Sequence, residues 1–179
     1  MIKKKASLAI IGIGARLPGE INHANGFWQA LIKGKNCITD VPEDRWNINK
    51  FYDSNPNKKE KIKSKKGGFI KGTKEFDAEF FNIFPKVAQN LDPRQRHLLE
   101  IIYESLEDAG LTLKQISGSN TAVMIGVFLG DEGKKIAGSD LESINSHSAM
   151  GAADTTVSAR VSYQFNLKGP TLSVDTACS

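Results

Sequence analysis

The chain has 179 residues, of which 40% are hydrophobic and 25% are charged, and its net charge is +4. This composition is typical of a folded globular domain and excludes wholesale disorder, while no apolar run approaches the ~20 residues of a membrane span. The charge surplus is too small to indicate a nucleic-acid-binding protein. Two cysteines, Cys37 and Cys178, cannot form a disulfide framework, so we expect a reducing compartment, the cytoplasm.

The first predicted element is a strand at Leu8–Gly12, a short apolar run rich in β-forming residues and typical of a strand buried on both faces. A turn follows over residues 14–19. The charged and apolar residues from Met1 to Gly14 resemble a signal peptide only superficially, because Arg16 and Pro18 close the short apolar run. A nucleotide-binding loop is not expected either, since Leu17 stands where the dinucleotide fingerprint needs glycine.

The next segment combines a predicted helix with long polar loops. Residues Phe27–Ile32 have helical spacing, with Asn25 as the expected N-cap and Gly34 as the stop. Pro42–Asn57 has no clean period and is predicted to be a loop. Lys58–Lys66 holds six lysines in nine residues, and their mutual repulsion predicts an extended, solvated loop. This loop is either a solubilising excursion or a docking patch for an acidic protein.

The strongest helix prediction is Asp92–Ala109. Asp92 is a suitable N-cap, Pro93 suits the first helical position, and Gln95 completes an arrangement like a capping box. Gly110 is expected to end the helix. One apolar stripe runs along it, formed by Leu98, Ile101, Ile102, Leu106 and Ala109.

The last third of the chain alternates strands with helical segments. Thr121–Phe128 is predicted as a buried strand, Gly130–Ser146 as a long polar loop, His147–Phe165 as helical and Thr171–Asp175 as a final strand. Strands that alternate with helices indicate an α/β domain with parallel pairing. Because the sequence stops directly after a strand, we expect an incomplete domain.

The candidate functional residues are few. None of the three histidines, His23, His97 and His147, has metal-ligand spacing, so we expect no metal site. Cys178 directly follows a predicted strand and is flanked by small residues. If a helix began there, its dipole and free N–H groups would stabilise a thiolate and an oxyanion. A buried structural cysteine is the alternative, and these residues alone leave both readings open.

The stretch Val174-Asp-Thr-Ala-Cys178-Ser179 resembles the active-site motif of the β-ketoacyl synthases, specifically the ketosynthase domains of modular polyketide synthases. Other blocks resemble this family in the same order and cover essentially the whole chain: residues 9–19, 41–46, 76–81, 91–96, 98–100, 106–110, 159–163 and 168–170. Ala15, Arg94 and the segment 84–88 depart from the family's usual residues, which leaves a relaxed or decaying gene copy as an alternative.

The resemblance implies a thiolase-like layered α/β fold, of which residues 1–179 would be the first part of the N-terminal half of a ketosynthase domain. It implies that Cys178 is the nucleophile, with its backbone N–H in the oxyanion hole. The acyl chain would come from the phosphopantetheine of an acyl carrier protein, with no cofactor bound directly. A decarboxylative Claisen condensation with a malonyl-type carrier would follow, in polyketide or fatty-acid biosynthesis.

The implied partners are the acyl carrier protein, a second copy in a homodimer and downstream synthase domains, with no nucleic acid and no membrane span. The family's two catalytic histidines lie beyond the nucleophile, and none of His23, His97 or His147 occupies a matching position. We therefore expect the 179-residue chain to be inactive alone. The alternative function is a non-catalytic remnant or an interaction module for dimerisation or carrier-protein docking.

Overall fold

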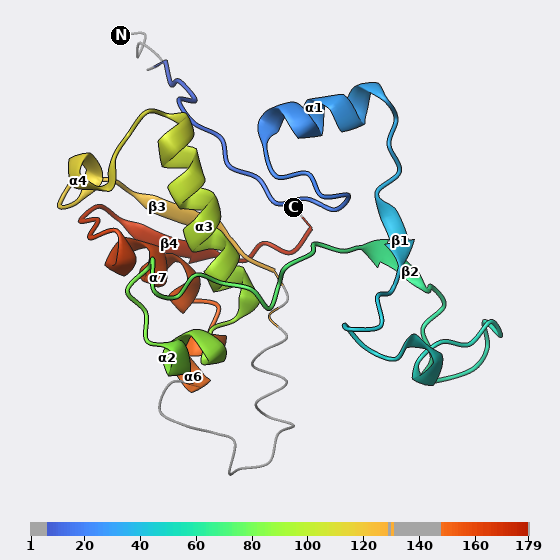
Figure 1. The fold of residues 1–179 in the computed structure, drawn as a ribbon. Helices are drawn as coiled ribbons and strands as arrows, with labels where there is room; N and C mark the ends of the chain where they lie inside the picture. Colours follow the sequence, from blue (N-terminus) through green and yellow to red (C-terminus); the bar gives the residue numbers. More distant parts are fainter. Residues whose placement is uncertain (1–6, 129, 131–147, 179) are drawn as a thin grey trace, which may run out of the picture. The chain divides into compact units, whose positions relative to one another are not determined.

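The computed structural model describes residues 7–128, 130 and 148–178 (Figure 1). The chain divides into two compact units, unit 1 with Met1–Ile13 and Thr73–Ser179, and unit 2 with Gly14–Gly72. Of the long loop predicted over Gly130–Ser146, only Gly130 is described, and His147 also lies outside the described residues. Within the described part of the chain, no helix is long and apolar enough to cross a membrane.

Unit 1 is built on two parallel strands, β3 (Val123–Gly126) and β4 (Thr171–Val174). Val123 lies opposite Thr171 and Gly126 opposite Val174, so the two strands end at the same edge. Both predicted strands are confirmed, each shorter than its apolar run. The parallel pairing confirms the expected α/β arrangement, since the chain passes through helices between the two strands.

Helix α3 (Pro93–Asp108) confirms the strongest helix prediction. The Asp92 side chain accepts a hydrogen bond from the backbone N–H of Arg94 at 2.7 Å, and Gly110 at φ +69° follows the last turn. The predicted capping box is wrong. Gln95 is fully buried, and its side-chain amide donates to the carbonyl of Gly151 instead of reaching back to the cap.

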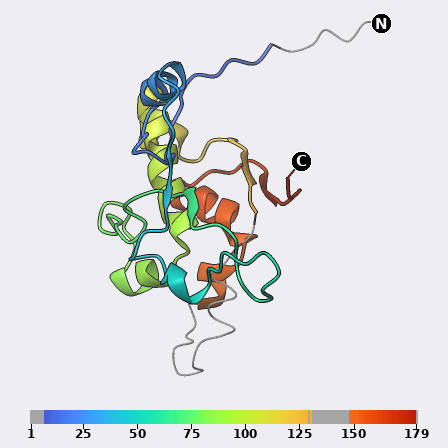
Figure 2. The same cartoon turned by 90° about the vertical axis from the view of Figure 1, so that its right-hand side faces the viewer.

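The core of unit 1 lies where α3, α7 (Thr156–Gln164) and the strands meet. Helix α7 packs on α3 and on both strands, and Figure 2 shows α3 and α7 side by side. Leu99 on α3 and Val161 on α7 are both almost completely buried. The other buried members of this cluster are Phe81, Ile83, Ala88, Leu91, Ile116, Val123 and Phe165.

Shorter helices complete unit 1. They are α2 (Pro85–Asn90), α4 (Leu113–Ile116) and α6 (Ser148–Ala152). The predicted helical stretch from His147 to Phe165 therefore contains two helices, α6 and α7, separated by residues 153–155. Helix α4 was not predicted, although it begins with a capping box formed by Thr112 and Gln115.

The predicted buried strand at Leu8–Gly12 is wrong. These residues form no strand, and Leu8 and Ile10 are 96% and 85% exposed. No described strand pairs with the segment, so its apolar side chains have no sheet to join. The residue that follows the segment contacts the end of α3, where the N–H of Ile13 donates to the Asp108 carboxylate at 2.9 Å.

Unit 2 contains the predicted helix, here α1 (Ala24–Ile32). Its N-cap is His23 rather than the predicted Asn25, because His23 Nδ1 accepts a hydrogen bond from the N–H of Gly26 at 2.9 Å. Gly34 has a φ of +57° just beyond the helix, which confirms the predicted stop. The predicted turn before the helix lies between Leu17 and Ile21, which form an antiparallel bridge.

The rest of unit 2 is a pair of short strands joined by a long irregular segment. Strands β1 (Ile38–Asp40) and β2 (Lys66–Gly68) are antiparallel, and a single 3₁₀ turn, η1 (Ile48–Lys50), lies between them. The sequence analysis predicted neither strand, because each has three residues and neither shows apolar alternation. Pro42–Asn57 is otherwise a loop, as predicted.

Candidate active site

The structure places Cys178 just beyond the carboxyl end of β4, on a tight turn. Asp175 Oδ1 accepts a hydrogen bond from the N–H of Ala177 at 2.9 Å, and Ala177 has a φ of +53°. Alanine in this region costs roughly 1–2 kcal/mol, so the turn holds a strained backbone immediately before the thiol. Cys178 itself is exposed and free in the described part of the chain.

The edge of the sheet at which Cys178 lies is where parallel sheets usually carry their sites. The N–H of Val127 donates to the carbonyl of Val174 at 2.9 Å, so β3 and β4 stay paired up to their carboxyl ends. Ligands of open parallel sheets bind beyond these ends because connecting loops diverge there. The predicted nucleophile therefore occupies a position that suits reaction with an external substrate.

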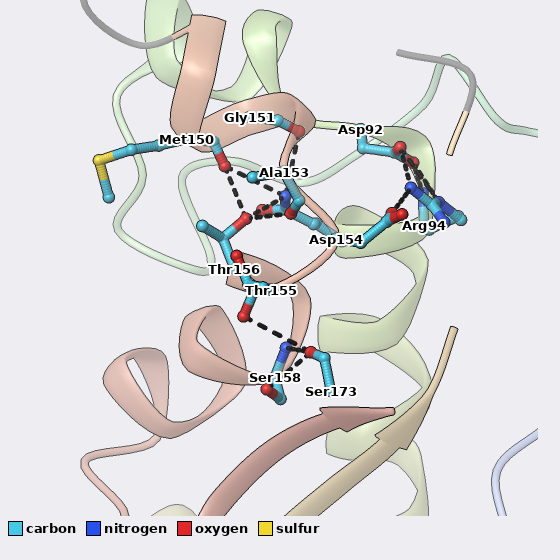
Figure 3. A network of polar contacts seen from close by, with 11 residues as sticks. Asp92, Arg94, Met150, Gly151, Ala153, Asp154, Thr155, Thr156, Ser158 and Ser173 are labelled. Atoms are coloured by element: carbon cyan, nitrogen blue, oxygen red, sulfur yellow. Dashed lines mark hydrogen bonds and ion pairs between the residues drawn. The ribbon is translucent and has the colours of Figure 1, made fainter. Parts of the chain in front are cut away.

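Helix α7 fixes β4 through two pairs of hydroxyl groups. Ser158 Oγ lies 2.8 Å from Ser173 Oγ, and the Ser158 N–H also donates to Ser173 Oγ at 3.2 Å (Figure 3). One turn further along the helix, Ser162 Oγ lies 2.6 Å from Thr171 Oγ1. These bonds set the position of the strand that leads to Cys178, and the sequence analysis did not identify them.

A second group of contacts links the start of α3 to the start of α7. The guanidinium of Arg94 binds Asp92 Oδ2 at 2.8 Å and Asp154 Oδ1 at 2.6 Å, as Figure 3 shows. The hydrogen bond from Arg94 to Asp92, whose side chain is only 4% exposed, helps raise the pKa of the arginine. A Cβ at Gly130 would lie 2.6 Å from Asp154 Oδ1 and 2.7 Å from Arg94 Nη2, so a larger residue there would displace this ion pair.

Buried Gln95 connects three helices. Its side-chain nitrogen donates to the carbonyl of Gly151 on α6 at 3.0 Å and to Thr156 Oγ1 at the start of α7 at 3.1 Å. Its side-chain oxygen accepts from Arg160 Nε at 3.3 Å, and burial lowers the pKa of Arg160. The only sequence signal for this role was a polar residue within an otherwise apolar helix face. Through Gln95, α3 positions α7 and hence the strand before Cys178.

The other sequence candidates are distributed elsewhere. His23 caps α1, and His97 Nδ1 lies 3.4 Å from Glu100 Oε2 on α3. Cys37 is a free, half-buried thiol in unit 2. Across the described ranges, no group of three or more His, Cys, Asp or Glu side chains could hold a metal ion.

Comparisons with known proteins show the family to which the chain belongs. Residues 5–179 match the family described as "Beta-ketoacyl synthase, N-terminal domain". The chain is 41% identical over 172 residues to a phenolphthiocerol/phthiocerol polyketide synthase of Mycobacterium tuberculosis, covering 96% of this chain and 11% of that protein. It is also 41% identical over 175 residues to a highly reducing polyketide synthase of Pyrenophora dematioidea, covering 96% of this chain and 7% of the relative.

Solved structures show the same likeness. An oxazolomycin ketosynthase domain from Streptomyces albus JA3453 superposes with a TM-score of 0.81 at 30% identity, covering 93% of this chain and 28% of that one. The ketosynthase from module 6 of the bacillaene synthase from Bacillus subtilis 168 gives 0.78 at 32% identity, with coverages of 96% and 26%.

The fold is therefore that of the thiolase-like ketosynthases, and the expected fold class is confirmed. The chain belongs to the β-ketoacyl synthase family and matches its N-terminal domain. It spans about a tenth or less of the two curated relatives and about a quarter of the two solved ketosynthase chains.

Proposed function

We propose that residues 1–179 are the N-terminal portion of a ketosynthase domain and that Cys178 is its nucleophile. The observation that carries this proposal is the exposed thiol of Cys178 at the carboxyl end of β4, presented by the positive-φ turn at Ala177. The relatives that share this region are named as polyketide synthases. The turn and the α7–β4 hydroxyl contacts hold the thiol at the edge of the sheet.

The proposed reaction begins with the attack of the Cys178 thiolate on the carbonyl carbon of a phosphopantetheine thioester. A new C–S bond forms, the carrier thiol leaves with a proton, and an acyl-enzyme remains. The backbone N–H of Cys178 stabilises the oxyanion of the tetrahedral intermediate. A malonyl-type unit on an acyl carrier protein then loses carbon dioxide, and its enolate carbon attacks the acyl-enzyme. This step releases the cysteine and leaves the lengthened chain on the carrier.

The apolar face of the sheet supports the view that further segments of the domain cover it. Met124, Leu172 and Val174 share this face and are 67%, 50% and 48% exposed. Strands of a parallel sheet are normally covered on both faces. We propose that the remaining layers of a ketosynthase domain, and its partner copy in a homodimer, supply this cover. We also propose that downstream synthase domains are partners of this domain and that the protein is located in the cytoplasm.

Thiol labelling tests the proposed nucleophile, with Cys37 as an internal control. A β-lactone or epoxide inhibitor that acylates or alkylates thiolates is added to residues 1–179 and to a chimera that continues with the rest of a relative's ketosynthase domain. Peptide mass spectrometry gives the rate at each cysteine. We expect the chimera to be labelled at Cys178 much faster than at Cys37, whereas residues 1–179 alone form no condensation product.

Two results of this experiment would contradict the proposal. If Cys178 and Cys37 react equally slowly in a chimera that circular dichroism shows to be folded, then Cys178 is not an activated nucleophile. The alternative, a non-catalytic interaction module, would then be favoured. If Cys178→Ala leaves the labelling of the chimera unchanged, the reactive thiol lies elsewhere.

A further inference from the structure

The charge of the chain is concentrated in one segment of unit 2. Residues 51–72, here called the lysine surface, hold seven lysines and two carboxylates, a net charge of +5 in a chain whose total is +4. The sequence predicted an extended loop in this region because its lysines repel one another. The loop is exposed, but it is not extended, since Ile62 forms a parallel bridge with Tyr52.

Three of the lysines hold the loop in place. Lys58 Nζ pairs with Asp53 Oδ2 at 2.7 Å, and this hydrogen bond lowers the pKa of Asp53. Lys61 Nζ donates to the carbonyl of Lys50 at 2.6 Å, and Lys63 Nζ donates to the carbonyl of Asn55 at 2.5 Å. These ammonium groups are used within the loop, so they fix its shape.

Three other lysines are presented to solvent by this frame. Lys59 and Lys66 are exposed, and neither side chain forms a hydrogen bond or ion pair with another described residue. Lys65 is exposed with its ammonium 4.4 Å from the centre of the Tyr52 ring. The loop therefore presents these three cations from a backbone that its own contacts hold in place.

Apolar side chains lie among these cations. The Ile62 N–H donates to the carbonyl of Phe51 at 2.9 Å, so these two residues are neighbours, and their side chains are 44% and 49% exposed. Exposed apolar groups beside a cluster of like charges are typical of protein docking surfaces, where the apolar part is buried and the charges form the rim. Opposite charge on the partner would speed encounter and set its orientation.

We propose that the lysine surface docks an acidic protein, and that this protein is the carrier that delivers the thioester to Cys178. The identity of the carrier rests on the proposed function, whereas the acidic character of the partner rests on the surface itself. The net charge of the whole chain is only +4, a surplus too small to indicate a nucleic-acid-binding protein, so a carboxylate-rich protein is the better partner. Two half-exposed apolar side chains offer too little area to anchor the loop in a membrane.

Binding measurements on the whole 179-residue chain test this inference without any reaction. The probe is an acidic acyl carrier protein in its apo form, which lacks phosphopantetheine and acyl chain. We expect the triple variant Lys59→Glu, Lys65→Glu and Lys66→Glu to bind it on the order of tenfold more weakly. We also expect binding to weaken between about 0.1 M and 1 M salt, where the screening length falls from ~10 Å to ~3 Å.

A matched control separates this local effect from the change in total charge. Lys33, Lys74 and Lys168 are exposed lysines outside the lysine surface, and their triple replacement by glutamate changes the net charge equally. The control should retain carrier binding. Equal weakening by both triple variants would overturn the proposal, as would unchanged binding in the first. Because glutamates could disturb the loop, the triple glutamine variant is measured in parallel, and it should also weaken binding.

Two further probes decide between classes of partner. Tighter binding of a single-stranded RNA oligomer, or of vesicles that contain phosphatidylserine, than of the carrier protein would overturn the assignment of an acidic protein. Labelling of Cys178 by a small inhibitor in the chimera is independent of docking. Carrier binding that depends on the lysine surface, without activated labelling, would support docking but not the proposed catalysis. Activated labelling without carrier binding would support the proposed catalysis and overturn docking at this surface.

Discussion

Different interactions stabilise each of the two units of the chain. Unit 1 has an apolar core in which helices α3 and α7 pack against two parallel strands. Unit 2 has few buried apolar side chains, and its long segment is held by lysines that donate to backbone carbonyls and by short-range side-chain turns. The comparison shows that repeated lysines can order a loop when carbonyl oxygens lie within their reach, instead of only repelling one another.

The largest expected effect comes from the core of unit 1. Leu99→Ala removes a fully buried side chain from α3 and should lower the free energy of unfolding of unit 1 by about 2–5 kcal/mol. Both tryptophans, Trp28 and Trp46, lie in unit 2, so their fluorescence reports on that unit. During urea denaturation, tryptophan fluorescence follows the unfolding of unit 2. Circular dichroism, to which the helices of unit 1 contribute most, follows the unfolding of unit 1.

Leu31→Ala on α1 is the matched control, because Leu31 is 55% exposed and its loss should cost much less. If Leu99→Ala shifted the tryptophan transition as far as the helical transition, the two units would unfold together. The distinction between them would then fail.

Sequence reasoning succeeded where one local pattern determines the structure. The cap at Asp92, the apolar stripe and the stop at Gly110 were enough to predict α3, because each acts within the helix itself. It failed at Gln95 and at Leu8–Gly12, whose conformations depend on distant parts of the chain. A glutamine three residues after an N-cap resembles a capping box until the carbonyl of Gly151, 56 residues away, is known to accept from it.

The candidate site was predicted only in part. The position of Cys178 after a strand was visible in the sequence, and the structure shows β4 ending four residues earlier. The hydroxyl pair of Ser158 and Ser173 could not be predicted, because serine in a helix or strand gives no signal for its partner. The fixed lysines were missed for the same reason, since their acceptors are backbone carbonyls of other loop residues.

A medium effect is expected from the ion pair at the start of α3. Arg94→Gln leaves the Asp92 carboxylate almost fully buried without its guanidinium, which should lower the free energy of unfolding by about 1–3 kcal/mol. Asp154→Asn should cost less, because Asp154 is 38% exposed and water can replace part of the contact. Chemical denaturation measures both. An equal loss in the two variants would show that the burial of Asp92 is not the cause.

A smaller effect is expected in unit 2. The double variant Lys61→Met and Lys63→Met removes the ammonium groups that hold the carbonyls of Lys50 and Asn55. Amide hydrogen exchange over residues 51–63 should become several-fold faster, while exchange in α3 stays unchanged. Lys59→Met is the control, since its ammonium holds no described carbonyl. Unchanged exchange in the double variant would mean that the turns alone order the loop.

The smallest effect concerns acid. The hydrogen bond from Lys58 holds the pKa of Asp53 below its ordinary value of 3.8, so this contact stabilises the loop above that pH. The stabilisation should disappear as the pH falls through the lowered pKa of the folded state. The amide signal of Asn55, whose N–H donates to Asp53 Oδ1 at 2.9 Å, reports this titration by NMR. Lys58→Met should move the midpoint up toward 3.8, and an unmoved midpoint would exclude the ion pair as its cause.

The most direct test of the central claim is acyl transfer to one named sulfur. An acyl N-acetylcysteamine thioester, which needs no carrier, is added to the chimera that continues residues 1–179 with the rest of a ketosynthase domain. Intact mass followed by peptide mapping locates the adduct. The account predicts one acyl group on Cys178, lost in Cys178→Ala and retained in Cys37→Ala. A folded chimera that acquires the acyl group on Cys37, or none at all, would contradict it.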